Sequence, residues 1–164
     1  MSAPLQLTLG IIKPSVTAHQ PHVQDIMRAI KQSGLEIVRT KRIFWKEKDA
    51  QQFYAEHEGR FYYPRLVQHA SSGPFVALAL CGPDAIQTWR ALIGPTKVFQ
   101  GQWERPDALR SRYGLSDTRN GFHGSDSPES ARRELGQVFE GWDIDFILEQ
   151  RRRDQPERQP RSPP

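Results

Sequence analysis

Cysteine is almost absent from this sequence. Of its 164 residues only Cys81 is a cysteine, which excludes an internal disulfide and any metal site built on two cysteines. We expect Cys81 to pack in the core, and a single thiol fits a reducing compartment. Long apolar runs are missing as well, because no stretch approaches the roughly eighteen residues of a membrane span. The start, MSAPLQLTLG, lacks the basic first region of a secretory signal, so we expect an intracellular protein without a membrane span.

Two common nucleotide-binding patterns are also missing. The sequence contains neither a glycine-rich loop ending in Gly-Lys-Ser/Thr nor the glycine fingerprint of dinucleotide-binding folds. Any nucleotide must therefore be bound by other means.

Excess positive charge is concentrated at the C-terminus. The net charge is +4, and residues 151–164 contain five arginines against Asp154 and Glu157, so this segment supplies most of the excess. The segment also has four prolines and no apolar side chain. We expect a domain over residues 1–150 and a basic, proline-rich, disordered tail over 151–164. The tail could contact acidic partners or nucleic acid, but it has no aromatic residues to stack on bases, so nucleic acid is the less favoured partner.

The pattern of apolar residues predicts one α+β domain. Alternation of Leu5, Leu7, Leu9 and Ile11 predicts a strand with one buried face, ending at Pro14. Further expected strands are LEIVRTKRIFW and PFVALALCG; expected helices are VQDIMRAIKQSG, a helical hairpin over 46–73, PDAIQTWRALIGP and a helix following Ser127. The apolar residues of segment 95–117 show no clear helical or strand periodicity, so we expect a long loop there. This order of elements suits a sandwich with a small, largely antiparallel sheet.

Lys13 lies at the end of the inward-facing row of the first strand. A buried ammonium needs a partner, so Lys13 either turns out to solvent or meets a polar pocket.

His123 stands between Gly121 and Gly124, just before a helix that Ser127 and Pro128 begin. Glu134 falls inside the apolar stripe of that helix and must find a donor. One interpretation is that Glu134 accepts a hydrogen bond from one ring nitrogen of His123 and leaves the other free as a nucleophile. The alternative is a surface histidine beside a glutamate paired with Arg112 or Arg119.

Arginines gather in the same part of the chain. Arg90, Arg110, Arg112 and Arg119, with the hydroxyl of Thr96, provide groups of the kind that bind polyphosphate, since guanidinium forms forked bonds with phosphate. Each arginine taken singly could equally be a solvated surface residue.

Four motifs resemble one family. NGFHGSDSPESARRE resembles the active-site signature of nucleoside diphosphate kinases, and LGIIKPSV, HEGRFYYPRLVQHASSGP and TWRALIGPT resemble that family's other hallmarks in the right order. The resemblance covers residues 5 to about 140 and has features of the divergent nucleoside diphosphate kinase 6 branch. It implies a ferredoxin-like fold with a four-stranded antiparallel sheet covered by helices. It also implies ping-pong transfer of a γ-phosphate from a nucleoside triphosphate to a diphosphate through a phosphohistidine. Relatives of this branch suggest mitochondria, and the cytoplasm is the other expected location.

The resemblance assigns roles to individual positions. His123 matches the phosphorylated residue, with Glu134 and Ser125 as orienting partners and Tyr54 near the nucleophile. Lys13 and Asn120 match the residues that bind the sugar hydroxyls, and Arg90, Thr96 and Arg110 match the phosphate clamp. Mg²⁺ is expected to be bound mainly through the nucleotide phosphates, without a set of protein ligands.

Three positions depart from the family pattern. Tyr62 replaces the phenylalanine that stacks on the base, Asp117 replaces the opposite apolar wall, and the spacing from Thr96 to Arg110 is longer than in typical members. The segment after Phe139 lacks the family's usual ending, so a monomer is plausible and a homo-oligomer is the less favoured expectation. An alternative is therefore a nucleotide-binding or partner-binding module of the same fold with weak or no kinase turnover.

Overall fold

A four-stranded antiparallel sheet organises the molecule. The computed structural model describes residues 3–155. Its strands are β1 (Leu5–Ile12), β2 (Glu36–Ile43), β3 (Phe75–Pro83) and β4 (Phe122–Gly124). Their order in the sheet is β2-β3-β1-β4, and all three neighbouring pairs are antiparallel. The predicted four-stranded α+β sheet is confirmed.

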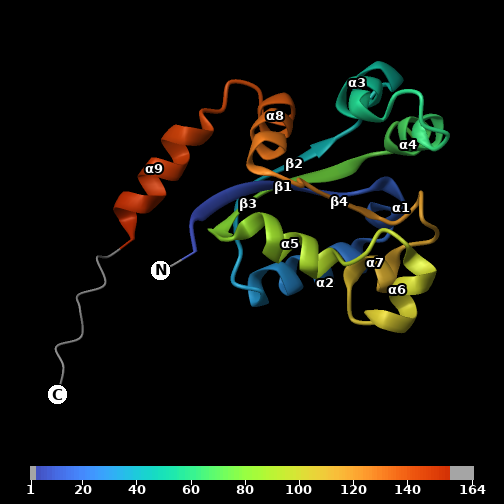
Figure 1. Ribbon diagram of the computed structural model, residues 1–164, viewed down its shortest axis with the longest axis horizontal. Helices are drawn as coiled ribbons and strands as arrows, with labels where there is room; N and C mark the ends of the chain where they lie inside the picture. The colour runs from blue at the N-terminus through green and yellow to red at the C-terminus, as the bar shows by residue number, and fades with distance from the viewer. Residues whose placement is uncertain (1–2, 156–164) are drawn as a thin grey trace.

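Helices cover both faces of this sheet (Figure 1). The helical elements are α1 (Pro14–Thr17), α2 (Gln20–Gln32), α3 (Glu47–Phe53), the 3-10 helix η1 (Ala55–His57), α4 (Tyr63–Ala70), α5 (Ala85–Ile93), α6 (Val98–Glu104), α7 (Leu109–Tyr113), α8 (Pro128–Val138) and α9 (Ile144–Asp154). Figure 1 shows α3, α4 and α8 on one side of the sheet and α2 and α5 on the other. Among these residues, no helix has the length and apolar character needed to cross a bilayer.

The expectation that β1 has one buried face is wrong, because both of its faces are covered. Leu7, Leu9 and Ile11 pack in the core under α8, whereas Ile12 belongs to a second core on the opposite face. Between them, Thr8 is fully buried. The alternation along β1 therefore separates two helix layers and does not separate core from solvent.

Residues 95–117 contain two helices and are not a structureless loop. In α6, the hypothetical Cβ of Gly101 would lie 2.8 Å from Ser111 Oγ of α7 and 3.1 Å from Pro95. A glycine inside a helix lowers its intrinsic stability, but here it allows α6 and α7 to pack closely. Tertiary contact thus supports a helix that the local sequence does not indicate.

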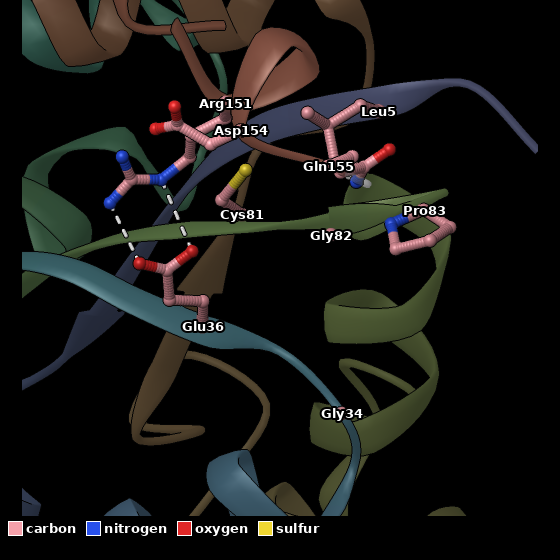
Figure 2. A pocket seen from close by; sticks show the side chains of 9 residues that line it. All are labelled: Leu5, Gly34, Glu36, Cys81, Gly82, Pro83, Arg151, Asp154 and Gln155. Carbon is pink, nitrogen blue, oxygen red and sulfur yellow. Dashed lines mark hydrogen bonds and ion pairs between the residues drawn. The ribbon is translucent and has the colours of Figure 1, made fainter. Parts of the chain in front are cut away.

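The chain after Phe139 forms α9, which extends past the predicted domain boundary. Asp143 Oδ1 accepts a hydrogen bond from Phe146 N at 3.0 Å and caps the helix, and Leu148 is buried. Near the end of α9, Arg151 forms a two-pronged ion pair with Glu36 of β2, at 2.7 and 3.1 Å (Figure 2). The prediction of a disordered tail is therefore wrong for residues 151–154, which belong to α9. Residues 156–164 of the predicted tail lie outside the described residues.

Candidate active site

His123 lies on the edge strand β4, with its ring held by α8. The ring nitrogen Nε2 is 2.7 Å from Glu134 Oε1 and 3.0 Å from Oε2. The Glu134 side chain is only 6% exposed, compared with 21% for His123. A buried carboxylate that accepts from Nε2–H leaves Nδ1 as the ring nitrogen with a free lone pair. Glu134 therefore pairs with His123, and the alternative pairing with Arg112 or Arg119 is wrong.

Two glycines allow the backbone to hold this histidine. Gly121 has φ +87°, and a Cβ there would lie 2.8 Å from Val16 Cγ2. At Gly124 a Cβ would lie 2.8 Å from Trp89 Cδ1, so the absence of a side chain makes room for the indole. Trp89 Nε1 then donates a 2.9 Å hydrogen bond to the carbonyl of His123. The main chain is fixed on both sides of the imidazole.

Arg90 and Arg110 are anchored to the carbonyls on either side of His123. Arg110 Nη2 donates to Phe122 O at 3.2 Å and Nη1 to Gly94 O at 2.7 Å, while Arg90 Nη1 donates to Gly124 O at 3.3 Å. Burial and the nearby charge of Arg90 lower the pKa of Arg110 to about 10, so it remains charged at neutral pH. Two arginines from α5 and α7 thus converge beside one imidazole.

Lys13 is buried and does not turn out to solvent. It is 6% exposed, and its Nζ lies 3.4 Å from Asn120 Oδ1. Burial and the charge of Arg110 lower the pKa of Lys13 to about 7. Lys13 and Asn120, 107 residues apart in the sequence, therefore form a buried polar contact near Arg110.

Aromatic rings pack against the imidazole. The ring centroid of Phe53 is 5.1 Å from that of His123, and the centroid of Tyr54 is 6.5 Å away. Tyr54 is 6% exposed, and burial followed by the charge of Glu134 raises its pKa well above the usual range. The phenol therefore stays protonated and can act only as a neutral hydrogen-bonding group near the histidine.

The remaining predicted residues lie further out. Tyr62 precedes α4 and its hydroxyl is 3.1 Å from His57 Nδ1. Asp117 Oδ1 accepts a hydrogen bond from Val98 N at 3.0 Å and thereby stabilises the start of α6. Thr96 is exposed in the turn before α6, and no hydrogen bond joins its side chain to the other site residues in the described part of the chain.

Ser125 does not make the contact predicted for it, and two residues beside His123 were not predicted. Ser125 is fully buried, and its Oγ accepts a hydrogen bond from Leu9 N at 3.2 Å, so its observed bond holds β1 and does not orient His123. Two residues near His123 were not predicted to belong to the site. Phe53 packs against the imidazole, and Trp89 donates a hydrogen bond to the carbonyl of His123. The only signal for them is position, since each directly precedes a predicted site residue, Tyr54 or Arg90.

Comparisons with known proteins identify the family. The family model "Nucleoside diphosphate kinase" matches residues 6–144. This chain belongs to the nucleoside diphosphate kinase family. Nucleoside diphosphate kinase 6 of Homo sapiens is 48% identical over 135 residues, covering 82% of this chain and 73% of that protein. The Danio rerio protein of the same name is 50% identical over 138 residues, covering 82% and 77%. These similarities support the predicted nucleoside diphosphate kinase 6 branch.

A solved structure supports the same family fold. The crystal structure of the Aquifex aeolicus nucleoside diphosphate kinase superposes with a TM-score of 0.81 at 35% identity, covering 85% of this chain and 99% of that one. The ferredoxin-like fold implied by the sequence resemblance is thereby confirmed.

Proposed function

We propose that this protein transfers the γ-phosphate of a nucleoside triphosphate to a nucleoside diphosphate through a phosphohistidine on His123. The observation that carries the proposal is the imidazole itself, whose Nε2 is bonded to the buried Glu134 while Arg90 and Arg110 bind the carbonyls next to it. A histidine with a free Nδ1, whose neighbouring carbonyls anchor two cations, suits a transferring phosphoryl group, because phosphoryl transfer depends on positioning and charge neutralisation.

In the first half-reaction, the Nδ1 lone pair of His123 forms a bond to the γ-phosphorus. The bond between that phosphorus and the bridging oxygen breaks, and its electron pair leaves on the diphosphate. Arg90 and Arg110 neutralise the charge that develops on the phosphate oxygens, and Glu134 stabilises the positive charge on the ring. In the second half-reaction, the terminal oxygen of an incoming diphosphate forms a bond to the phosphorus of the phosphohistidine. The bond from phosphorus to Nδ1 breaks, and its electron pair returns to Nδ1 and restores the free ring.

The outer residues would hold the rest of the nucleotide. Lys13 and Asn120 would bind the sugar hydroxyls, and Thr96 would add a hydroxyl to the phosphate clamp. Tyr62 would stack on the base, with Asp117 on the opposite side. Because the carboxylate of Asp117 accepts from Val98 N, its role at the base would be confined to forming the rim. Ser125 would support the site by joining β4 to β1, and Tyr54 would line the wall beside the histidine.

Mg²⁺ fits this proposal as a companion of the nucleotide phosphates. Among residues 3–155, no group of three or more His, Cys, Asp or Glu side chains could hold a metal ion. The cationic side chains of the site instead suit phosphate oxygens, and Mg²⁺ commonly binds through such oxygens. When bound with the nucleotide, the ion would neutralise phosphate charge. Nucleotide pools lie inside cells, so we place the activity in mitochondria or the cytoplasm.

The test is incubation of the intact protein with γ-labelled ATP and Mg²⁺, followed by quenching and peptide mapping. We expect one acid-labile phosphate on His123, removed by added ADP. His123→Asn should abolish the label, and His19→Asn, which changes an exposed histidine, should retain it. Absence of label in folded protein that binds ATP would defeat the proposal.

A second candidate is a nucleotide-binding or partner-binding module with weak turnover. It is favoured by Asp117, whose carboxylate is committed to α6 where the family has an apolar wall. Tight ADP binding together with negligible steady-state transfer would favour this function. Sedimentation of the same sample would show whether it acts as a monomer or an oligomer.

A further inference from the structure

Two adjoining pockets lie between α4, α1 and the loop that precedes Asn120. The first has a volume of about 350 Å³ between α4 and the loop at residues 116–119, and its lining includes Arg65, Gln68 and Thr118. The second, about 580 Å³, lies between α1, the start of α2 and β2, and its lining includes Ser15 and Arg42. His69, Ser72 and Arg119 line both. We call them together the basic pocket pair.

The basic pocket pair is lined by positive and neutral groups only. No aspartate or glutamate lines either pocket. In the described part of the chain, Arg42, Arg65 and Arg119 form no salt bridge with any carboxylate. All three arginines are exposed. Two of them line each pocket, Arg119 together with Arg65 in the first and with Arg42 in the second, and such a pair without a carboxylate suits an oxyanion.

Two polar atoms in the walls also lack partners. His69 is 7% exposed, and neither its Nε2 nor the Oγ of Ser15 has a hydrogen-bond partner among residues 3–155. A buried polar atom without a hydrogen bond costs free energy, so two such atoms at these pockets point to a bound group that forms the missing hydrogen bonds. Burial, and to a smaller extent the positive charges of Lys13 and Arg119, lower the pKa of His69 to about 4, so its ring is neutral at pH 7.

We propose that the basic pocket pair binds a small phosphate-type oxyanion, such as pyrophosphate or the phosphate of a small metabolite, at a site separate from the Arg90 and Arg110 clamp. None of the residues that we assign to phosphate transfer lines either pocket. Arg119 provides the forked donor common to both pockets, and Arg65 or Arg42 provides a second guanidinium. Because Arg119 and Pro14 directly adjoin Asn120 and Lys13, the bound anion would lie beside the sugar-binding side of the nucleotide cleft.

Calorimetric titration of inorganic pyrophosphate into the full-length protein tests the proposal. The titration is run in EDTA, with and without saturating ADP, so that the nucleotide occupies the clamp. We expect up to two pyrophosphates to bind without ADP, one of them in the clamp, and one to bind when ADP is present. Arg119→Ala should weaken its affinity about tenfold or more, because a charged hydrogen bond is lost. Arg112→Ala, which removes another exposed arginine of the same segment, is the matched control and should leave the affinity within about twofold.

Two more variants locate the anion. Arg65→Ala should weaken binding if the first pocket is occupied, and Arg42→Ala if the second is occupied; either result supports the proposal. Loss of pyrophosphate binding when ADP is present would overturn it, as would equal affinities for the Arg119 and Arg112 variants. If the protein binds no ADP, the proposed kinase function fails, whereas Arg119-dependent pyrophosphate binding would still stand.

Discussion

Replacing Glu134 with glutamine changes the charge opposite the imidazole and almost nothing else. Both carboxylate oxygens of Glu134 lie within 3.0 Å of His123 Nε2, and the side chain is 6% exposed. Glutamine has the same length, and its carbonyl oxygen can accept the same hydrogen bond. The substitution removes only the negative charge, which would stabilise the positive charge that develops on the ring as it is phosphorylated.

The size of the effect follows from the difference between charged and neutral hydrogen bonds. A bond to a charged group contributes about 1.5–3 kcal/mol, compared with about 0.5–1.5 kcal/mol for a neutral one. The Glu134→Gln variant should therefore lose about 1–2 kcal/mol of transition-state stabilisation, which lowers the rate of histidine phosphorylation roughly 5- to 30-fold.

The assay is a single-turnover reaction with excess enzyme and labelled ATP, quenched in base to preserve phosphohistidine. Glu129→Gln removes an exposed carboxylate from the same helix and serves as the control, with an expected rate close to that of the unmodified protein. Circular dichroism checks that both variants are folded. A Glu134→Gln rate equal to that of the control would refute the reasoning, since the carboxylate would then hold the ring without contributing charge.

Three further predictions concern other contacts. Because the pKa of Lys13 is about 7, its ammonium is lost as pH rises above 7, so ADP binding at pH 8 should take up a proton and weaken toward pH 9; calorimetry in two buffers measures this, and no proton uptake would contradict it. Asp117→Ala removes the acceptor for Val98 N and should cost about 1 kcal/mol of unfolding free energy in urea titration; an unchanged midpoint would show that the bond is not needed. Arg151→Ala breaks the partly exposed pair with Glu36 and should cost less than about 1 kcal/mol while accelerating amide exchange in α9; unchanged exchange would contradict the anchoring of α9.

Much of the fold is visible in local patterns. The predicted strands and most predicted helices are present because alternation and helical spacing are strong in them, as in Leu5 to Ile11. Ser127 caps α8 as expected, with its Oγ accepting from Ser130 N at 3.1 Å. Helices α6, α7 and α9 were not predicted. Helix α6 contains Gly101, which allows it to pack closely against Ser111 of α7. Helix α9 has a weak apolar stripe, and its Arg151 pairs with the distant Glu36.

Some features of the candidate site were likewise predictable from the sequence, and others were not. A carboxylate in the apolar stripe of α8 was enough to predict that Glu134 needs a donor, with His123 as one of two candidate partners, and the bond to His123 is present. The contact of Ser125 with Leu9 and the packing of Phe53 against the imidazole were not predictable, since they join residues distant in the sequence. The same is true of the hollow around His69 and Arg119, where three chain segments meet.

By itself, the amino-acid sequence determined the identity of the reactive groups, the order of strands and helices, and the family motifs, because all of these are expressed over a few consecutive residues. Only the tertiary structure decided that β1 is buried on both faces and that Lys13 turns inward to Asn120. It alone brought Arg90 and Arg110 to the carbonyls of the two residues that flank His123. The reason is physical: burial, charge convergence and unpaired buried atoms depend on which distant segments pack together, and local periodicity carries no information about that choice.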